Sequence, residues 1–84
     1  MKTKLIIKYC DPSHGWIKVS KLDPKLNLIR NKITSCSYES KHYLYLEEDY
    51  DAPLYTNLFE NIEIKHRYTN NRSKIRQLNT YKGN

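Results

Sequence analysis

Glycine, proline and cysteine are scarce in this chain of 84 residues, and it has no long hydrophobic run. Two glycines and three prolines exclude a collagen-like or Pro/Gly-rich low-complexity chain. Cys10 and Cys36 could form one bridge, but we expect free thiols, as in a reducing cytosol. The N-terminal apolar run Leu5–Ile7 is far too short for a membrane span or a signal peptide. The sequence therefore predicts a soluble intracellular protein.

Acidic residues are absent from the last quarter of the chain. Residues 1–63 contain nine Lys or Arg and nine Asp or Glu, whereas residues 64–84 contain six Lys or Arg and no acid. The whole formal net charge of +6 therefore lies in that last quarter. Such asymmetry favours an anionic partner, either nucleic acid or an acidic protein face. The alternative is a solvated tail that only keeps a small protein soluble.

Alternation of apolar and polar residues predicts the strands. The pattern is clear in residues 43–46, where Leu44 and Leu46 should face the core and Tyr43 and Tyr45 the opposite side. Similar patterns predict strands at 4–9, 16–19 and 62–68, and a weaker one at 33–38. The strands at 4–9 and 16–19 should form an antiparallel hairpin, because Pro, Gly and cap-forming residues separate them.

Two short helices are expected between these strands. The first covers about residues 21–28 or begins at Asp23, since Pro24 is tolerated only in a first turn. The second covers about residues 52–60, with Asp51 at its cap and Pro53 in its first turn. Residues 72–84 show no periodicity, which predicts an extended basic arm.

Together these elements predict an α+β fold with a small, mainly antiparallel sheet of four to five strands and two short helices. With 38% apolar residues, the chain can build one modest core. We expect a single domain over residues 1–68 and a basic C-terminal arm over residues 69–84.

Four segments also carry a resemblance. They are Asp-Pro-Ser-His-Gly-Trp at 11–16, Ser-Tyr at 37–38, Tyr-Leu-Glu-Glu-Asp-Tyr-Asp-Ala at 45–52 and Thr-Asn-Asn-Arg-Ser-Lys-Ile-Arg at 69–76. In this order, over nearly the whole length, the chain resembles a family of small uncharacterised bacteriophage proteins. The resemblance implies a virus-encoded protein in a bacterial host cytoplasm. It implies no activity and assigns no functional residues.

The sequence offers two sets of possible metal ligands, one of Cys and His and one of acidic residues, and neither is favoured. The cysteines and histidines could supply four zinc ligands, from Cys10, His14, Cys36 and either His42 or His66, but their spacing matches no established zinc motif. The acidic run could bind a divalent cation through Glu47, Glu48, Asp49 and Asp51. Helix capping by Asp49 or Asp51, with ion pairing of the other two to the basic arm, explains it better. We predict no metal site and no cofactor.

A thiol nucleophile is also disfavoured. Cys10, His14 and Asp11 could in principle act as nucleophile, base and orienting group. Three catalytic groups within five residues rarely reach the required geometry, and a structural turn held by Asp11 and Ser13 explains the segment. We predict no catalytic residues and no enzymatic activity.

The basic arm and the exposed tyrosines are the predicted partner-binding residues. Arginine and lysine can grip phosphates while tyrosines stack on bases, and Tyr and Arg are equally favoured at protein interfaces. In the structural alternative, the tyrosines pack on a helix or on the arm. The predicted set is Tyr43, Tyr45, Tyr68, Arg67, Arg72, Lys74 and Arg76.

The sequence therefore favours a small non-enzymatic phage accessory protein that binds and modulates a host factor, such as a defence or gene-expression component. The alternative is a nucleic-acid-binding protein that uses the basic arm on phosphates. A host protein partner is expected, a nucleic-acid partner or a homodimer is an open alternative, and no membrane association is expected.

Overall fold

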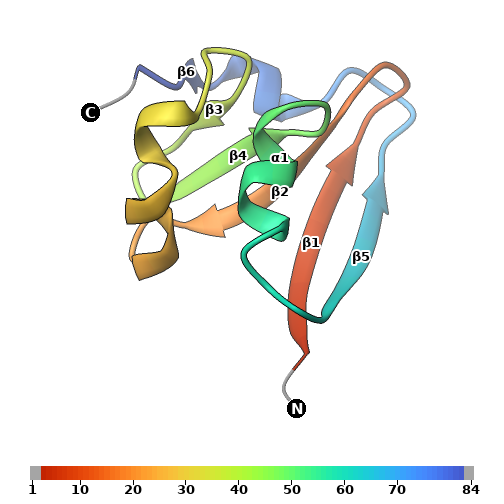
Figure 1. The fold of residues 1–84 in the computed structure, drawn as a ribbon. Coiled ribbons are helices and arrows are strands. Elements are labelled where there is room, and N and C mark those ends of the chain that lie inside the picture. Colours follow the sequence, from red (N-terminus) through yellow and green to blue (C-terminus); the bar gives the residue numbers. More distant parts are fainter. Residues whose placement is uncertain (1–2, 83–84) are drawn as a thin grey trace.

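The computed structural model describes residues 3–82, which contain six strands and one short helix joined by turns and loops (Figure 1). The strands are β1 (Lys4–Cys10), β2 (Gly15–Ser20), β3 (Tyr38–Glu39), β4 (Tyr43–Glu47), β5 (Ile62–Tyr68) and β6 (Asn79–Thr80). The helix is α1 (Asp51–Thr56), and the 3-10 turns are η1 (Pro24–Leu28), η2 (Arg30–Lys32) and η3 (Lys74–Gln77). The predicted α+β class is confirmed.

The strands form one mixed sheet in the order β5-β1-β2-β4-β3-β6. Only β1 and β5 pair in parallel, and the other neighbours are antiparallel. The predicted hairpin of β1 and β2 is present, as is the mainly antiparallel sheet. The strand number exceeds the predicted four to five because the C-terminal segment contributes β6, which pairs with β3.

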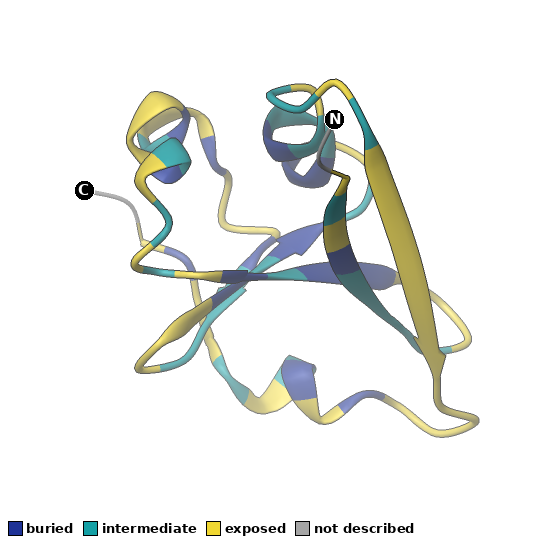
Figure 2. Ribbon diagram, turned by 90° about the horizontal axis from the view of Figure 1, so that it is seen from below, coloured by how far each residue is buried: buried dark blue, intermediate teal, exposed yellow. Residues whose placement is uncertain are grey.

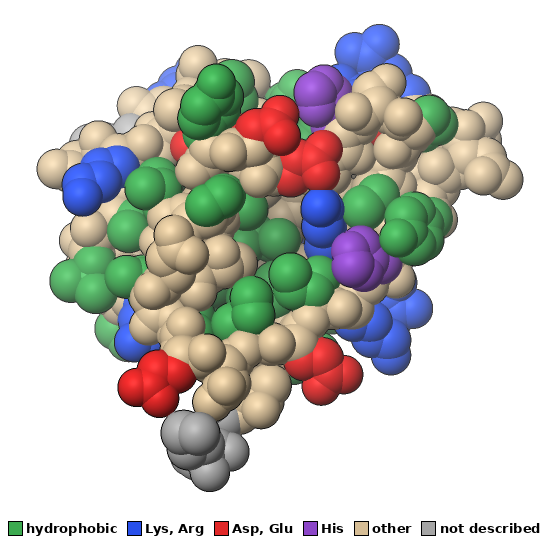
Figure 3. Space-filling view, turned by 45° about the vertical axis from the view of Figure 1, so that its right-hand side comes forward, with side chains coloured by type: hydrophobic (Ala, Val, Ile, Leu, Met, Phe, Trp, Pro, Cys, Tyr) green, Lys and Arg blue, Asp and Glu red, His purple; other side chains and the backbone are tan. Residues whose placement is uncertain are grey.

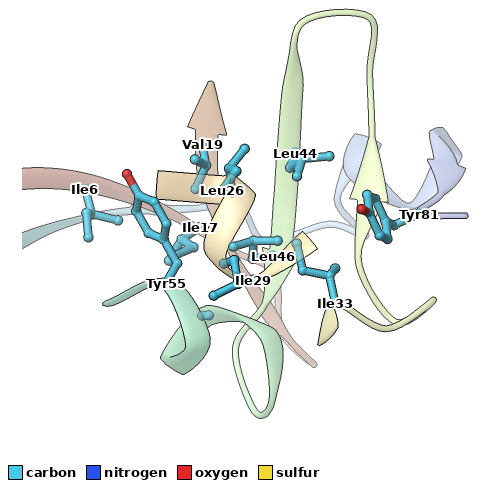
Figure 4. Close-up of a cluster of buried hydrophobic side chains, with 11 residues drawn as sticks. Ile6, Ile17, Val19, Leu26, Ile29, Ile33, Leu44, Leu46, Tyr55 and Tyr81 are labelled. Carbon is cyan, nitrogen blue, oxygen red and sulfur yellow. The ribbon is translucent and has the colours of Figure 1, made fainter. Parts of the chain in front are cut away.

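The core lies on one face of the sheet, beneath α1 and the first two 3-10 turns (Figures 2 and 4). Leu44 and Leu46 of β4 are buried as predicted, and Tyr43 lies on the opposite face. Burial of such side chains stabilises the fold through the hydrophobic effect. The buried cluster contains Ile6, Ile17, Val19, Leu26, Ile29, Ile33, Leu44, Leu46, Ala52, Tyr55 and Tyr81.

Both predicted helices are shorter than expected. The first is the single 3-10 turn η1, capped by Asp23, whose carboxylate accepts a hydrogen bond from Lys25 N at 2.9 Å. The second, α1, ends at Thr56 and not near residue 60. After the helix, the amides of Leu58 and Phe59 each donate a hydrogen bond to the carbonyl oxygen three residues earlier, the spacing of a 3-10 turn and not of an α-helix. Both side chains pack against the core in that tighter conformation.

The residues around α1 also differ from the sequence prediction. Tyr50 occupies the N-cap position and makes no side-chain cap. Asp51 is buried in the first turn, and its carboxylate accepts bonds from Thr34 and from Ser37 Oγ. These bonds hold residues 34–37 in a turn, so the strand predicted for 33–38 is reduced to Tyr38 and Glu39.

The separate basic C-terminal arm is not confirmed. Residues 73–78 lie on the face of the sheet opposite α1, where η3 lies (Figure 2). Ile75 is buried there, β6 then joins the sheet beside β3, and Tyr81 is buried in the core cluster described above. Sequence periodicity missed this segment because a four-residue 3-10 turn and a two-residue strand are too short to show a repeat.

The described residues pack into a body with a radius of gyration of 12.2 Å, about the value expected for a single domain of this length. Within residues 3–82, no helix has the length and hydropathy needed to cross a membrane.

Candidate functional site

Four of the seven predicted binding residues line one hollow at the end of β5, which we call the basic hollow. Arg67 and Tyr68 reach it from the strand, and Arg72 and Lys74 reach it from the segment that follows. Its volume is about 410 Å³. The lining residues are Tyr9, Cys10, Arg67, Tyr68, Thr69, Asn71, Arg72, Ser73 and Lys74.

Hydrogen bonds donated by backbone amides hold the walls of the basic hollow in place. Thr69 N donates to Cys10 O at 3.0 Å, which holds the turn after β5 beside the end of β1. Ser73 N donates to Asp11 Oδ2 at 3.1 Å, and Ser73 Oγ accepts from Ile75 N at 3.1 Å. These bonds anchor both ends of the segment that carries Arg72, so the hollow is a fixed feature of the fold.

No acidic group of the described residues neutralises the charge of the basic hollow. None of its lining residues is acidic, and within residues 3–82 no carboxylate lies at ion-pair distance from Arg67, Arg72 or Lys74. Unpaired cations around a concave surface concentrate positive potential there. The hollow can therefore receive an anionic group.

Arg76 belongs to the fold and not to the basic hollow. Its Nε donates to Asp11 Oδ2 at 2.7 Å and its Nη2 to Asp11 Oδ1 at 3.2 Å, while the guanidinium carbon lies 5.0 Å from the ring centre of Trp16. The bonded guanidinium holds the pKa of the Asp11 carboxyl well below its usual range. This predicted partner-binding residue is thus committed to an intramolecular contact.

The three predicted tyrosines have different environments. Tyr68 is 77% exposed, and its ring stacks on His66 with centroids 5.7 Å apart. Tyr43 lies beneath the ammonium group of Lys18, 4.1 Å from the ring centre. Tyr45 packs edge-on against Tyr9 at 6.3 Å. Only Tyr68 reaches the basic hollow, while Tyr45 is linked to it through Tyr9.

A second concavity surrounds the indole of Trp16, and we call it the tryptophan hollow. It has a volume of about 300 Å³. It is lined by His14, Trp16, Cys36, Tyr38, Glu47, Asp49, Tyr50 and Arg76. All four sequence segments of the resemblance contribute to this list, although they are far apart in the chain. The sequence suggested roles for several of these residues separately, but no sequence pattern predicts that they meet.

The acidic run is divided between different partners. Glu48 forms an ion pair with Lys8 at 2.9 Å and accepts a bond from Gly15 N at 3.0 Å, so it does not bind the C-terminal segment. A Cβ atom at position 15 would lie 2.6 Å from Lys8 Cε, so the end of the Lys8 side chain would have to move away from Gly15 to admit one. Glu47 and Asp49 turn instead toward the tryptophan hollow.

The proposed zinc and thiol groupings are not assembled within the described residues. His14 gathers with Glu47 and Asp49, and neither cysteine joins a group of possible ligands. Cys10 has no hydrogen bond to His14 within residues 3–82, and burial raises the pKa of its thiol, which opposes thiolate formation. The structural turn is present, since Asp11 Oδ1 accepts bonds from Ser13 N and His14 N. Both cysteines are free.

The surface near β5 combines apolar and basic groups. All seven residues of β5 are exposed, and the strand pairs only with β1. In the view that brings this side forward, apolar side chains lie between separate groups of Lys and Arg (Figure 3). Leu5 is 54% exposed, and Ile62 and Ile64 are each 37% exposed.

Comparisons with known proteins found no match to a protein-family model, to a curated protein or to a solved structure.

Proposed function

We propose that this chain is a small non-enzymatic binding protein that captures an acidic surface of a partner protein. The observation that carries the proposal is the convergence of Arg67, Tyr68, Arg72 and Lys74 on one hollow, with no ion pair to a carboxylate of residues 3–82. Arginine and tyrosine are the side chains that most often dominate binding energy at protein interfaces. A carboxylate from a partner would be bound there by charge-assisted hydrogen bonds.

The exposed apolar groups favour a protein partner over nucleic acid. Leu5, Ile62 and Ile64 lie on β1 and β5, the pair of strands from which Arg67 and Tyr68 extend. Ile62 and Ile64 lie on the same face of β5 as Tyr68, so this strand carries aliphatic, aromatic and basic groups together, a composition common at protein interfaces. Phosphate recognition alone gives no role to these aliphatic groups.

The biological setting belongs to the same proposal. Following the resemblance to bacteriophage proteins, the partner would be a host factor, such as a defence or gene-expression component, in the bacterial cytoplasm. A protein that acts by occupying such a factor needs affinity and charge complementarity and requires no turnover.

Affinity capture from bacterial lysate, with and without nuclease and at two salt concentrations, tests this function. One dominant protein that survives both nuclease and the higher salt would support the proposal. A mixture of nucleic-acid-associated proteins that disappears after nuclease treatment would contradict it.

Direct nucleic-acid binding is the second candidate, and one observation favours it. Tyr68 is highly exposed beside Arg67, Arg72 and Lys74, which form no ion pair within residues 3–82. This arrangement would allow a base to stack while phosphates bind Arg and Lys. In that case, affinity for single-stranded oligonucleotides should fall steeply as salt rises, because binding releases condensed counterions.

Self-association is a further proposal for the same region. The outer edge of β5 has no neighbouring strand within residues 3–82, and an unpaired edge can pair with a second copy. Sedimentation equilibrium across a concentration range would show a monomer–dimer equilibrium if it does, and a single monomer mass if it does not.

A further inference from the structure

The tryptophan hollow brings together three side chains that can bind one cation. One ligand atom from each of His14, Glu47 and Asp49 lies within 4.8 Å of the others. In a tetrahedral zinc site, bonds of about 2.1 Å place neighbouring ligand atoms about 3.4 Å apart. His14 and Asp49 are exposed and lie outside strands and helices. Small movements of their side chains can therefore bring the ligand atoms to the separation that a tetrahedral zinc ion requires.

The two carboxylates of this group form no ion pair with a Lys or Arg of residues 3–82. Glu47 is 7% exposed, its Oε1 accepts a bond from Tyr50 N at 3.1 Å, and no donor within residues 3–82 reaches its other oxygen. The one guanidinium that lines the hollow, from Arg76, is bound to Asp11. Two neighbouring carboxylates without a bound Lys or Arg repel each other, and a cation between them would remove that repulsion.

Trp16, which lines the same hollow, carries a buried and unpartnered donor. Trp16 is 2% exposed, and its Nε1 is the one buried side-chain nitrogen or oxygen of the described residues without a hydrogen-bond partner. An indole N–H is a donor only, and leaving it unpaired in the interior costs free energy. An oxygen ligand carried by a bound metal, such as water or a carboxylate, would give it an acceptor. The ring of Trp16 lies 6.2 Å from that of His14.

We propose that His14, Glu47 and Asp49 bind one divalent transition-metal ion, with a coordination position left open beside Trp16. Imidazole with two carboxylates suits Zn²⁺ or Mn²⁺ better than Mg²⁺ or Ca²⁺, which prefer oxygen ligands throughout. Three protein ligands leave the fourth position of a tetrahedral ion for water or for an oxygen of a partner. This site is separate from the basic hollow and does not depend on the function proposed above.

The single tryptophan of the chain provides the test. Purified full-length protein is titrated with ZnCl₂ and separately with MnCl₂ while Trp16 fluorescence is recorded, and calorimetry measures the stoichiometry. We expect a saturable change with one ion per chain, and at least a tenfold loss of affinity in His14→Ala and Asp49→Asn. In the 1H–15N spectrum, the single indole resonance should shift with Zn²⁺ and broaden with Mn²⁺.

Matched controls separate this site from adventitious binding. His42→Ala and Glu60→Gln remove an exposed histidine and an acid elsewhere on the surface, and Cys36→Ser removes the thiol at the rim of the hollow. All three should bind as tightly as the parent chain. The proposal is overturned if the parent shows no saturable change at millimolar metal, if Asp49→Asn binds equally well, or if Cys36→Ser alone abolishes binding. Circular dichroism of each variant shows that the fold is retained.

Discussion

A single carboxylate, that of Asp11, joins the β1–β2 turn to the C-terminal segment. It accepts bonds from Ser13 N and His14 N within the turn and from Ser73 N and Arg76 Nε across the molecule. Its side chain is 1% exposed and that of Arg76 is 16% exposed. Both hollows depend on this contact, because Ser73 lines the basic hollow and Arg76 lines the tryptophan hollow.

Replacing Arg76 by alanine should lower the free energy of unfolding by about 3 kcal/mol, because the buried Asp11 charge would lose its partner. Urea denaturation measures this loss. The control is Lys21→Ala, which breaks the more exposed pair between Lys21 and Glu39 and should cost less than about 1 kcal/mol. Equal losses in the two variants would show that Arg76 is not a structural residue.

The stability of the protein should fall in acid partly because of Asp11. Since its folded pKa lies below the usual value, the unfolded chain takes up the proton first as the pH drops below about 4. The stabilisation is complete above that pH and is lost as the pH falls toward the folded pKa. Unfolding free energies measured between about pH 5 and pH 2.5 should decrease less in Asp11→Asn than in the parent. An identical decrease in both would contradict this assignment.

At the residue scale, the sequence could indicate residues that lie close together along the chain but not contacts between distant positions. Arg67, Tyr68, Arg72 and Lys74 do lie together, because three of them flank one short turn after β5. The pairing of Arg76 with Asp11 spans 65 positions. No local spacing can indicate a contact between residues so far apart in the chain.

At the element scale, long alternating strands were predictable and short irregular elements were not. The predicted strand at 62–68 has the same bounds as β5, and β4 follows its alternation of Leu and Tyr. By contrast, η3 and β6 contain four and two residues, too few for a helical or strand pattern to recur and be recognised. Their positions are set by tertiary contacts, above all by the buried side chains of Ile75 and Tyr81.

The C-terminal segment should therefore contribute to stability. Tyr81 is 5% exposed, and its hydroxyl donates to Arg30 O at 3.1 Å. Tyr81→Ala should lower the free energy of unfolding by about 3 kcal/mol, whereas Tyr68→Ala, which removes an exposed ring, should change it by less than about 0.5 kcal/mol. Thermal or urea denaturation compares them. A free, unpacked arm would instead leave Tyr81→Ala as stable as the parent.

At the scale of the whole molecule, the charge asymmetry of the sequence becomes a localised surface. Six Lys or Arg follow residue 63. In the folded chain Arg76 pairs with Asp11, and three of the other five lie around the basic hollow. The sequence indicated an anionic partner from the count of charges. It could not indicate the hollow, which requires the end of β1 and the segment after β5 to meet.

The measurement that tests the proposed function most directly is affinity capture from nuclease-treated bacterial lysate. It compares the parent chain with a variant in which the charge of the basic hollow is reversed. Arg67→Glu combined with Arg72→Glu reverses the hollow, and Lys32→Glu combined with Lys41→Glu makes the same change in net charge at exposed sites elsewhere. We predict that the first variant loses the captured protein at least tenfold and that the control retains it. Equal capture by both variants, or equal loss in both, would contradict binding through the basic hollow.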